Sequence, residues 1–188
     1  MPVSTSISTA RTEEGATLSR GLIAASALAV LLAVACGDDD GAEAPTLDAY
    51  LRNVEAILQE SGQRFEELGS QGLAADDISN PADAVAIEKQ ARDIIGDSLD
   101  GLRKLDAPEE ASREHEELVV AANDYVHELD AFIGQLQGAQ TGDDVQALFA
   151  NIPGSPLDEA ANRLDTSCLQ LQDIATTRQI DVDLGCGE

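Results

Sequence analysis

Three cysteines carry the most reactive side chains of this sequence of 188 residues. Cys36 stands between an apolar run and three consecutive aspartates, whereas Cys168 and Cys186 lie near the C-terminus. A cysteine thiolate is a nucleophile and a metal ligand, and two thiols can pair as a disulfide. Because an odd number of cysteines leaves one unpaired in an exported chain, we expect Cys36 to have a chemistry of its own.

The segment before Cys36 is apolar but short. Fifteen uncharged residues, Gly21 to Ala35, follow Arg20. As a helix they would span about 22 Å, less than the roughly 30 Å hydrocarbon core of a membrane. This length is typical of the apolar region of a secretion signal. The alternative is an uncleaved signal anchor in which Cys36 is simply buried.

The stretch Ala33-Val34-Ala35-Cys36 resembles the lipobox of bacterial lipoproteins, although Ala33 stands where leucine is most usual. The resemblance implies cleavage between Ala35 and Cys36, and attachment of diacylglycerol to the Cys36 thiol. It divides the chain into a signal peptide at 1–35, a lipidated acidic tether at 36–45 and a domain at 46–188. The two or three acyl chains of a lipoprotein give stable attachment. Membrane lipid is thus the first expected partner, at the extracytoplasmic face.

The other two cysteines are expected to form a disulfide. Apolar residues alternate with Asp181, Asp183 and Gly185 after residue 179, a pattern typical of an extended segment with one buried face. A helix from Cys168 rises about 15 Å to residue 178, and the extended tail can return about 23 Å to Cys186. Such a bridge would contribute roughly 3 kcal/mol in the loop-entropy model. The alternatives are two free thiols or, less favoured, a metal site, which lacks further soft ligands nearby.

The two histidines do not indicate a metal or catalytic site. His115 and His127 are twelve residues apart on one expected helix, so they point about 120° apart and cannot share an ion. Asp124 and His127 have carboxylate-x-x-His spacing, but di-iron bundles need a second such motif and further glutamates. His115 is expected at the surface or its boundary. No nucleophile elbow, phosphate-binding loop or zinc motif occurs, so we predict no catalytic residue, cofactor or metal ligand.

The tether does not form a calcium loop. Asp38, Asp39, Asp40 and Gly41 resemble the start of an EF-hand loop, but no glutamate stands at the twelfth position. We interpret the run as a solvated acidic segment.

The charge of the chain limits its partners. Asp and Glu number 36 against 11 Lys and Arg, and the formal net charge is -25. Such a surface repels nucleic acid, so no nucleic-acid partner is expected. Hydrophobic residues make up 43% of the chain, which favours a folded domain over disorder.

Helical periodicity dominates the region after the tether. Apolar residues at helical spacing predict long helices at 47–68, with Phe65 on the apolar face, at 84–105, at 108–136 with Pro108 in the first turn, and at 155–178. A short helix is expected at 143–149, and Asn80 and Pro81 in a loop. These elements predict an all-α, up-and-down four-helix bundle whose extended tail folds back and is disulfide-linked to the last helix.

The stretches 102–125 and 168–187 resemble uncharacterised small helical lipoproteins of high-GC bacteria, a resemblance that implies an envelope domain without an activity. We therefore expect a membrane-anchored extracytoplasmic lipoprotein that binds a protein partner or a small ligand. The alternative is a solute-binding or sensory accessory component. A hydrolytic or metal-dependent enzyme is a third possibility, which would need a pocket where several carboxylates converge.

Overall fold

The computed structural model describes residues 45–70 and 80–186, all of which belong to one compact unit, Gly41–Glu188. These residues form five α-helices and one short 3-10 helix, and no strand occurs among them. The elements are α1 (Leu47–Ser70), α2 (Pro81–Leu102), η2 (Glu109–Ala111), α3 (Ser112–Gly138), α4 (Gly142–Ala150) and α5 (Pro156–Thr177). The predicted all-α class is therefore confirmed.

Four of these helices begin at a polar side chain that accepts a hydrogen bond from the first turn. Such caps satisfy backbone N–H groups that have no partner inside the helix. The prediction of a loop at Asn80 and Pro81 is correct for Asn80, which lies outside the helix, and wrong for Pro81. Asn80 accepts a hydrogen bond of 2.9 Å from the Ala82 N–H, and Pro81 occupies the first turn of α2, where its missing N–H costs nothing. The caps are Thr46, Asn80, Thr141 and Ser155.

The connection between α2 and α3 also differs from the prediction. Helix α2 ends at Leu102, before the expected Leu105, although Leu105 still packs against the core. Pro108 is not inside α3. It precedes η2, and α3 begins only at Ser112. Pro108 has an extended conformation, with ψ 158°, and lies outside the helix, whereas Ala111, with φ -123° and ψ 3°, separates η2 from α3.

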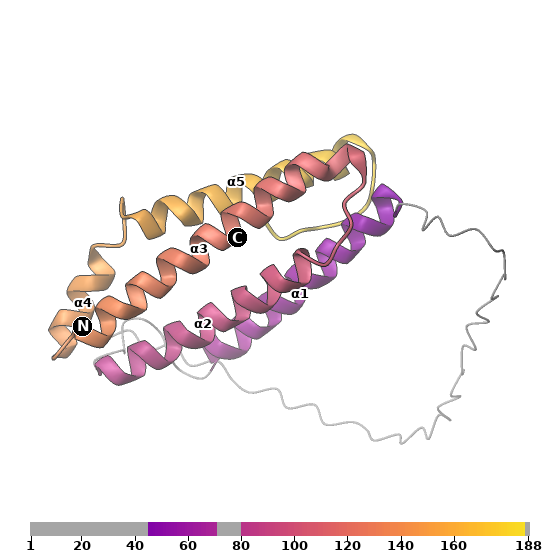
Figure 1. Cartoon of the computed structure of the whole chain (residues 1–188). Helices are drawn as coiled ribbons and strands as arrows, with labels where there is room; N and C mark the ends of the chain where they lie inside the picture. The colour runs from indigo at the N-terminus through magenta and orange to yellow at the C-terminus, as the bar shows by residue number, and fades with distance from the viewer. Residues whose placement is uncertain (1–44, 71–79, 187–188) are drawn as a thin grey trace, which may run out of the picture. The chain divides into compact units, whose positions relative to one another are not determined.

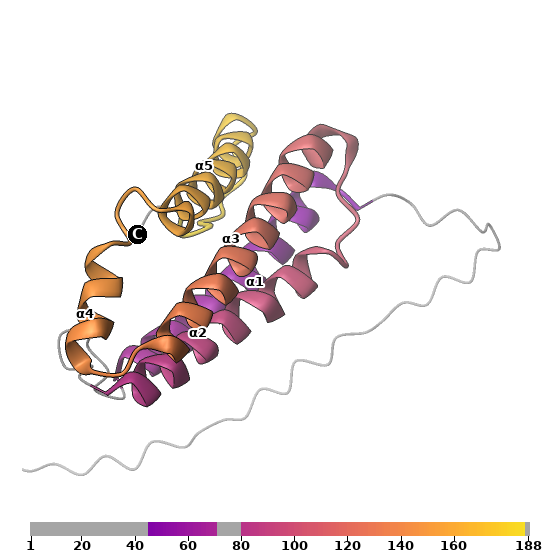
Figure 2. The ribbon, with the colours of Figure 1, turned by 60° about the vertical axis from the view of Figure 1, so that its left-hand side comes forward.

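The long helices pack in the order α1, α2, α3 and α5. Helix α3 lies between α2 and α5, and α1 packs against α2 (Figures 1 and 2). Small residues line the α1–α2 seam: a Cβ on Gly101 would lie 3.3 Å from Ile57 Cδ1, and the hydroxyls of Ser61 and Ser98 are hydrogen-bonded to each other. These residues let the two backbones approach closely.

The buried residues form two clusters. One, at the end of the bundle where α4 lies, joins α2, α3 and α4 to Leu68 and Leu157. The other joins α1, α3 and α5 to the C-terminal tail. Helices α1 and α5 make few direct contacts, and the tail supplies Val182 and Leu184 to the core that they share.

The tail, residues 179–186, turns back at the end of α5 and runs along it (Figure 1). Gln179 adopts the left-handed conformation, with φ 57°, and the Ile180 N–H donates to the Ala175 carbonyl at 2.9 Å. This pattern is a Schellman helix end, in which glutamine takes the place usually filled by glycine. Val182 and Leu184 are buried whereas Asp181 and Asp183 are exposed, as the alternation predicted.

The predicted disulfide is present. Cys168 of α5 is bonded to Cys186 at the end of the tail, with 5.7 Å between the two Cα atoms. The bridge closes a loop of eighteen positions in sequence and holds the returning tail against the helix it came from. The tail is therefore fixed at both ends, by the helix end at Gln179 and by the disulfide.

Candidate ligand-binding groove

A groove lies between α1, α5 and the end of the tail. Its volume is about 720 Å³. We call it the α1–α5 groove and define it by the residues that line it: Leu58, Gln59, Ser61, Gly62, Gln63, Phe65 and Glu66 of α1, Leu118 of α3, Leu164, Asp165 and Cys168 of α5, and Asp183 to Cys186 of the tail.

The floor of the α1–α5 groove is apolar. Leu118, Cys168 and Leu184 are buried and belong to the cluster that includes the tail. Phe65 lies at the rim, where 37% of its surface is exposed. The sequence pattern placed Phe65 on the buried face of its helix; its exposure follows from its place in the stretch of α1 that lines the open groove. An exposed aromatic ring beside a buried floor is a surface to which an apolar group can bind.

The rim of the groove is acidic. Among the residues that the structure describes, its charged lining residues are Glu66, Asp165 and Asp183, and no lysine or arginine lines it. None of these three carboxylates forms an ion pair with a residue in the ranges 45–70 and 80–186. By contrast, most arginines on the helices pair with nearby acids, such as Arg64 with Asp97 at 2.8 Å. Asp183 Oδ1 accepts a hydrogen bond of 3.0 Å from the Gly185 N–H. The groove therefore offers three carboxylates with which a cationic group can pair.

The tail closes one end of the groove through backbone contacts. The Gln172 Nε2 donates to the Val182 carbonyl at 3.1 Å, and its Oε1 accepts from the Leu184 N–H at 2.9 Å. The Asp183 N–H donates to Glu55 Oε1 at 2.8 Å. Two helices thus satisfy the polar backbone of an extended segment with side chains.

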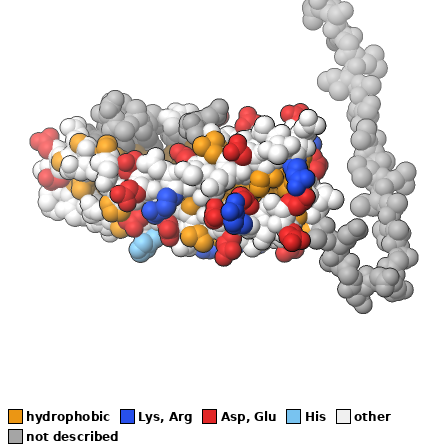
Figure 3. Space-filling view, turned by 90° about the horizontal axis from the view of Figure 1, so that it is seen from above, with side chains coloured by type: hydrophobic (Ala, Val, Ile, Leu, Met, Phe, Trp, Pro, Cys, Tyr) orange, Lys and Arg blue, Asp and Glu red, His pale blue; other side chains and the backbone are white. Residues whose placement is uncertain are grey.

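A second groove lies between α3 and α5, with a volume of about 490 Å³. Its two arginines already have acidic partners, Arg113 with Glu114 and Arg163 with Asp124. Gln170 contributes one buried oxygen, Oε1, that has no hydrogen-bond partner within the described part of the chain. We call this the α3–α5 groove. One face of the unit mixes acidic, basic and hydrophobic side chains in this way (Figure 3).

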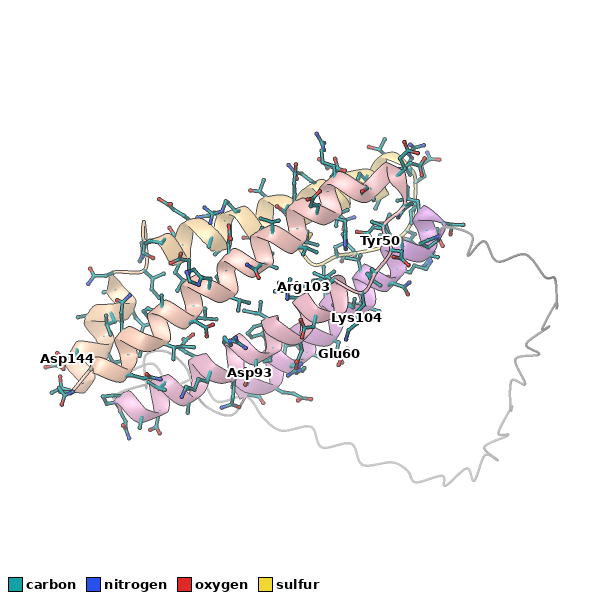
Figure 4. The ribbon with its side chains drawn as sticks, in the orientation of Figure 1. Tyr50, Glu60, Asp93, Arg103, Lys104 and Asp144 are labelled. Carbon is teal, nitrogen blue, oxygen red and sulfur yellow. A yellow bond between two sulfur atoms is a disulfide. The ribbon has the colours of Figure 1, made fainter. Side chains whose placement is uncertain are left out.

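The sequence did not predict the partner of His115. The Tyr50 hydroxyl lies 3.0 Å from His115 Nδ1, and Tyr50 is only 1% exposed. Tyr50 lies at the end of the bundle where the chain leaves α2, far from Asp144 of α4 (Figure 4). Burial raises the pKa of Tyr50, and the nearby Glu114 charge adds to the effect. Burial lowers the pKa of His115. The hydrogen bond of this pair is partly buried, and neither residue lines the grooves described above.

The pairing of Tyr50 with His115 had one signal in the sequence. Tyr50 falls on the apolar stripe of its helix, and a buried tyrosine hydroxyl needs a hydrogen-bond partner. The sequence could not identify that partner, because the two residues are 65 positions apart and meet only through packing.

Other residues singled out from the sequence are dispersed. His127 is exposed, and Asp124 pairs with Arg163 instead of sharing a ligand with His127. In residues 45–70 and 80–186 no three His, Cys, Asp or Glu side chains are arranged to hold a metal ion. Glu88 has a raised pKa because it is partly buried, but no metal cluster forms around it.

The predicted signal peptide, its cleavage site at Ala35 and the acceptor Cys36 lie outside the described residues. Within the described ranges, no helix combines the length and the apolar character needed to span a membrane. No protein-family model, curated protein or solved structure matches this chain.

Proposed function

We propose that this chain is a lipoprotein held at the extracytoplasmic face of a membrane by acylated Cys36, and that its helical domain is a binding module. The lipobox resemblance at 33–36 supports the anchor. The disulfide between Cys168 and Cys186 supports export, because disulfides form and persist in oxidising compartments. The acidic residues 38–40 would keep the start of the tether away from anionic headgroups.

The α1–α5 groove is the observation that carries the binding role. It combines a buried apolar floor with carboxylates that have no ion-pair partner in the described ranges. Its two cysteines are oxidised to a disulfide, and the hydroxyl of Ser61, its lining serine, is hydrogen-bonded to Ser98 and to the Ile57 carbonyl. Such a groove is suited to binding rather than to catalysis.

We further propose that the domain is an up-and-down four-helix bundle with α4 as an additional short helix. The contacts between neighbouring helices support this topology, because residue numbers rise along one helix while those of their partners fall along the other. Arg92 pairs with Asp130 and Arg103 with Asn123, which indicates that α2 and α3 are antiparallel. The ion pairs of α5 with α3, Arg163 with Asp124 and Arg178 with Glu110, have the same inverted order.

Site-specific cross-linking in intact cells tests the binding role. Gly62 lines the α1–α5 groove and Gly134 lies exposed on α3, and a Cβ at either would meet no atom within 4 Å. A photoreactive side chain at position 62 is expected to yield a discrete cross-linked product, and one at 134 none. Equal labelling from both positions, or none from position 62, would contradict a binding role for the groove.

A solute-binding role is the second candidate, and the α3–α5 groove favours it. Gln170 Oε1, which has no hydrogen-bond partner among the described residues, is an acceptor that a donor group of a small ligand would satisfy. This candidate predicts that a hydrogen-bond donor ligand raises the melting temperature of the native chain but not of Gln170→Leu. Equal stabilisation of both chains would exclude it.

A further inference from the structure

We propose that the α1–α5 groove binds an extended peptide segment of a partner protein, in which hydrophobic side chains alternate with lysine or arginine. The proposal rests on the binding role proposed above and specifies the ligand of that same groove. Three features of the groove carry it: the tail that already packs between α1 and α5, the amide side chains along α1, and the rim carboxylates, which have no ion-pair partner in the ranges 45–70 and 80–186.

The tail shows that this gap accepts an extended chain. Val182 and Leu184 point into the core, while Asp181 and Asp183 face solvent. Gln172 binds both a carbonyl and an N–H of the tail, as a neighbouring strand would. The α1–α5 groove begins at the end of this segment, because Asp183 to Cys186 form one of its walls. A partner segment would continue the track that the tail already follows.

Glutamines along α1 can form the same kind of hydrogen bonds with the backbone of a bound peptide. Gln59 and Gln63 are exposed and line the groove one helical turn apart. A glutamine amide has both donor and acceptor groups, as Gln172 demonstrates on the tail. An extended peptide needs such partners because its backbone groups must be hydrogen-bonded wherever they are removed from water.

The rim selects the charge of the ligand. Covering Glu66, Asp165 and Asp183 with a neutral apolar ligand would remove water from carboxylates without compensation, which is unfavourable. Lysine or arginine at alternate positions would pair with them while the intervening side chains face the floor. Alternate residues of an extended chain are about 6.8 Å apart, so one short peptide can reach several carboxylates. A single small amine can pair with only one or two.

The probe is a fluorescein-labelled peptide, Lys-Val-Lys-Leu-Lys-Val, whose binding to the full chain in non-ionic detergent is measured by fluorescence polarisation. Its block isomer, Lys-Lys-Lys-Val-Leu-Val, has the same composition and charge. Because only the alternating order can place lysines at the rim and apolar groups on the floor, we expect it to bind about tenfold more tightly. Equal affinities would overturn the extended alternating mode.

Filling the groove with a larger side chain tests whether the peptide binds there. Gly62→Phe places a ring in the groove where a Cβ has open space, and Gly134→Phe is the matched change on α3. We expect Gly62→Phe to abolish saturable binding and Gly134→Phe to leave it unchanged, with circular dichroism confirming that both are folded. Equal binding to the two variants would show that the peptide binds elsewhere and would overturn the proposal.

Neutralising the rim carboxylates tests whether their charge contributes to peptide binding, without changing the apolar core. The triple variant Glu66→Gln, Asp165→Asn, Asp183→Asn is compared with Glu60→Gln, Asp106→Asn, Asp143→Asn, which changes net charge equally at exposed sites outside the groove; Figure 4 labels Glu60 on α1. Loss of three rim ion pairs predicts about tenfold weaker binding, against little change in the control. Equal weakening would indicate nonspecific attraction to an acidic protein and would overturn the proposal.

A second binding measurement, with dodecylammonium as the probe, distinguishes a peptide ligand from a small cationic amphiphile. If this amine binds with the same dependence on Gly62 while the peptide does not bind, the groove takes small hydrophobic cations and the peptide proposal fails. The proposed function would survive that result. It would fail instead if position 62 gave no cross-linked product in cells.

Discussion

The backbone N–H of Asp183 donates a hydrogen bond of 2.8 Å to the carboxylate of Glu55, 128 positions earlier in the chain. This contact joins the C-terminal tail to α1, and the disulfide joins the same tail to α5. The tail therefore links two helices that make few contacts with each other. It also forms one wall of the α1–α5 groove, so the stability of the tail and the shape of the groove are connected.

The disulfide is expected to stabilise the domain. Cys168→Ser, or reduction of the native chain, should lower the free energy of unfolding by about 2–4 kcal/mol, because the cross-link restricts the unfolded chain. Urea denaturation with and without reductant measures the difference, and Cys36→Ser is the matched control. The non-reduced mass should also be two hydrogens below the dithiol mass. Two alkylatable thiols at Cys168 and Cys186 before reduction would contradict the bridge.

Gln172 is expected to hold the tail. Gln172→Ala removes two hydrogen bonds to the Val182 and Leu184 backbone, and should lower the free energy of unfolding by about 1–2 kcal/mol. Hydrogen exchange of the Leu184 N–H should accelerate in the same variant. Gln137→Ala, an exposed change on α3, is the control. Unchanged exchange at Leu184 would show that the amide does not hold the tail.

Gln179 is a position where glycine should stabilise the domain. The left-handed conformation at φ 57° is unfavourable for glutamine and open to glycine. Gln179→Gly should raise the free energy of unfolding by about 0.5–1 kcal/mol. Ala131→Gly, at an exposed position in the interior of α3, should lower it by about 1 kcal/mol. Destabilisation by both substitutions would mean that the helix end at Gln179 is formed differently.

His115 is expected to make stability depend on pH. Because burial lowers its pKa in the folded chain, the unfolded chain takes up the proton first as the pH falls. Its contribution to stability is present above the unfolded pKa of about 6.5 and is lost as the pH falls below that value. Denaturation between pH 8 and pH 5 should therefore show a smaller decline for His115→Gln than for the native chain.

The matched control for this pH dependence is His127→Gln, which removes an exposed histidine from the same helix. It should keep the native decline. If His115→Gln and the native chain lose stability in parallel, burial of His115 does not contribute to the pH dependence.

Local signals in the sequence predicted most of the elements. Helices α1, α4 and α5 begin within one residue of the positions expected from the sequence, and the period-two tail has the buried face that its alternation predicted. These features depend on neighbours a few residues apart. Asn80 and Pro81, a cap followed by proline, begin α2 three residues before the helix start at residue 84 that apolar spacing predicted.

The groove could not be predicted in the same way, because it depends on contacts between distant segments. Phe65 has helical spacing with the buried residues of α1, yet the groove leaves its ring partly exposed. Asp165 and Asp183 meet at one rim only because the tail turns back along α5. The pattern of a single helix shows which face is apolar, but not whether another element covers it.

Fractionation of cells that express Cys36→Ala tests the central claim, that the domain is anchored by lipid on Cys36. The account predicts that the native chain is found in the membrane fraction, with an N-terminal fragment whose mass corresponds to Cys36 carrying diacylglycerol. Cys36→Ala should be released from the membrane or remain as an unprocessed precursor. A mature-sized Cys36→Ala chain that stays fully in the membrane fraction would contradict the account.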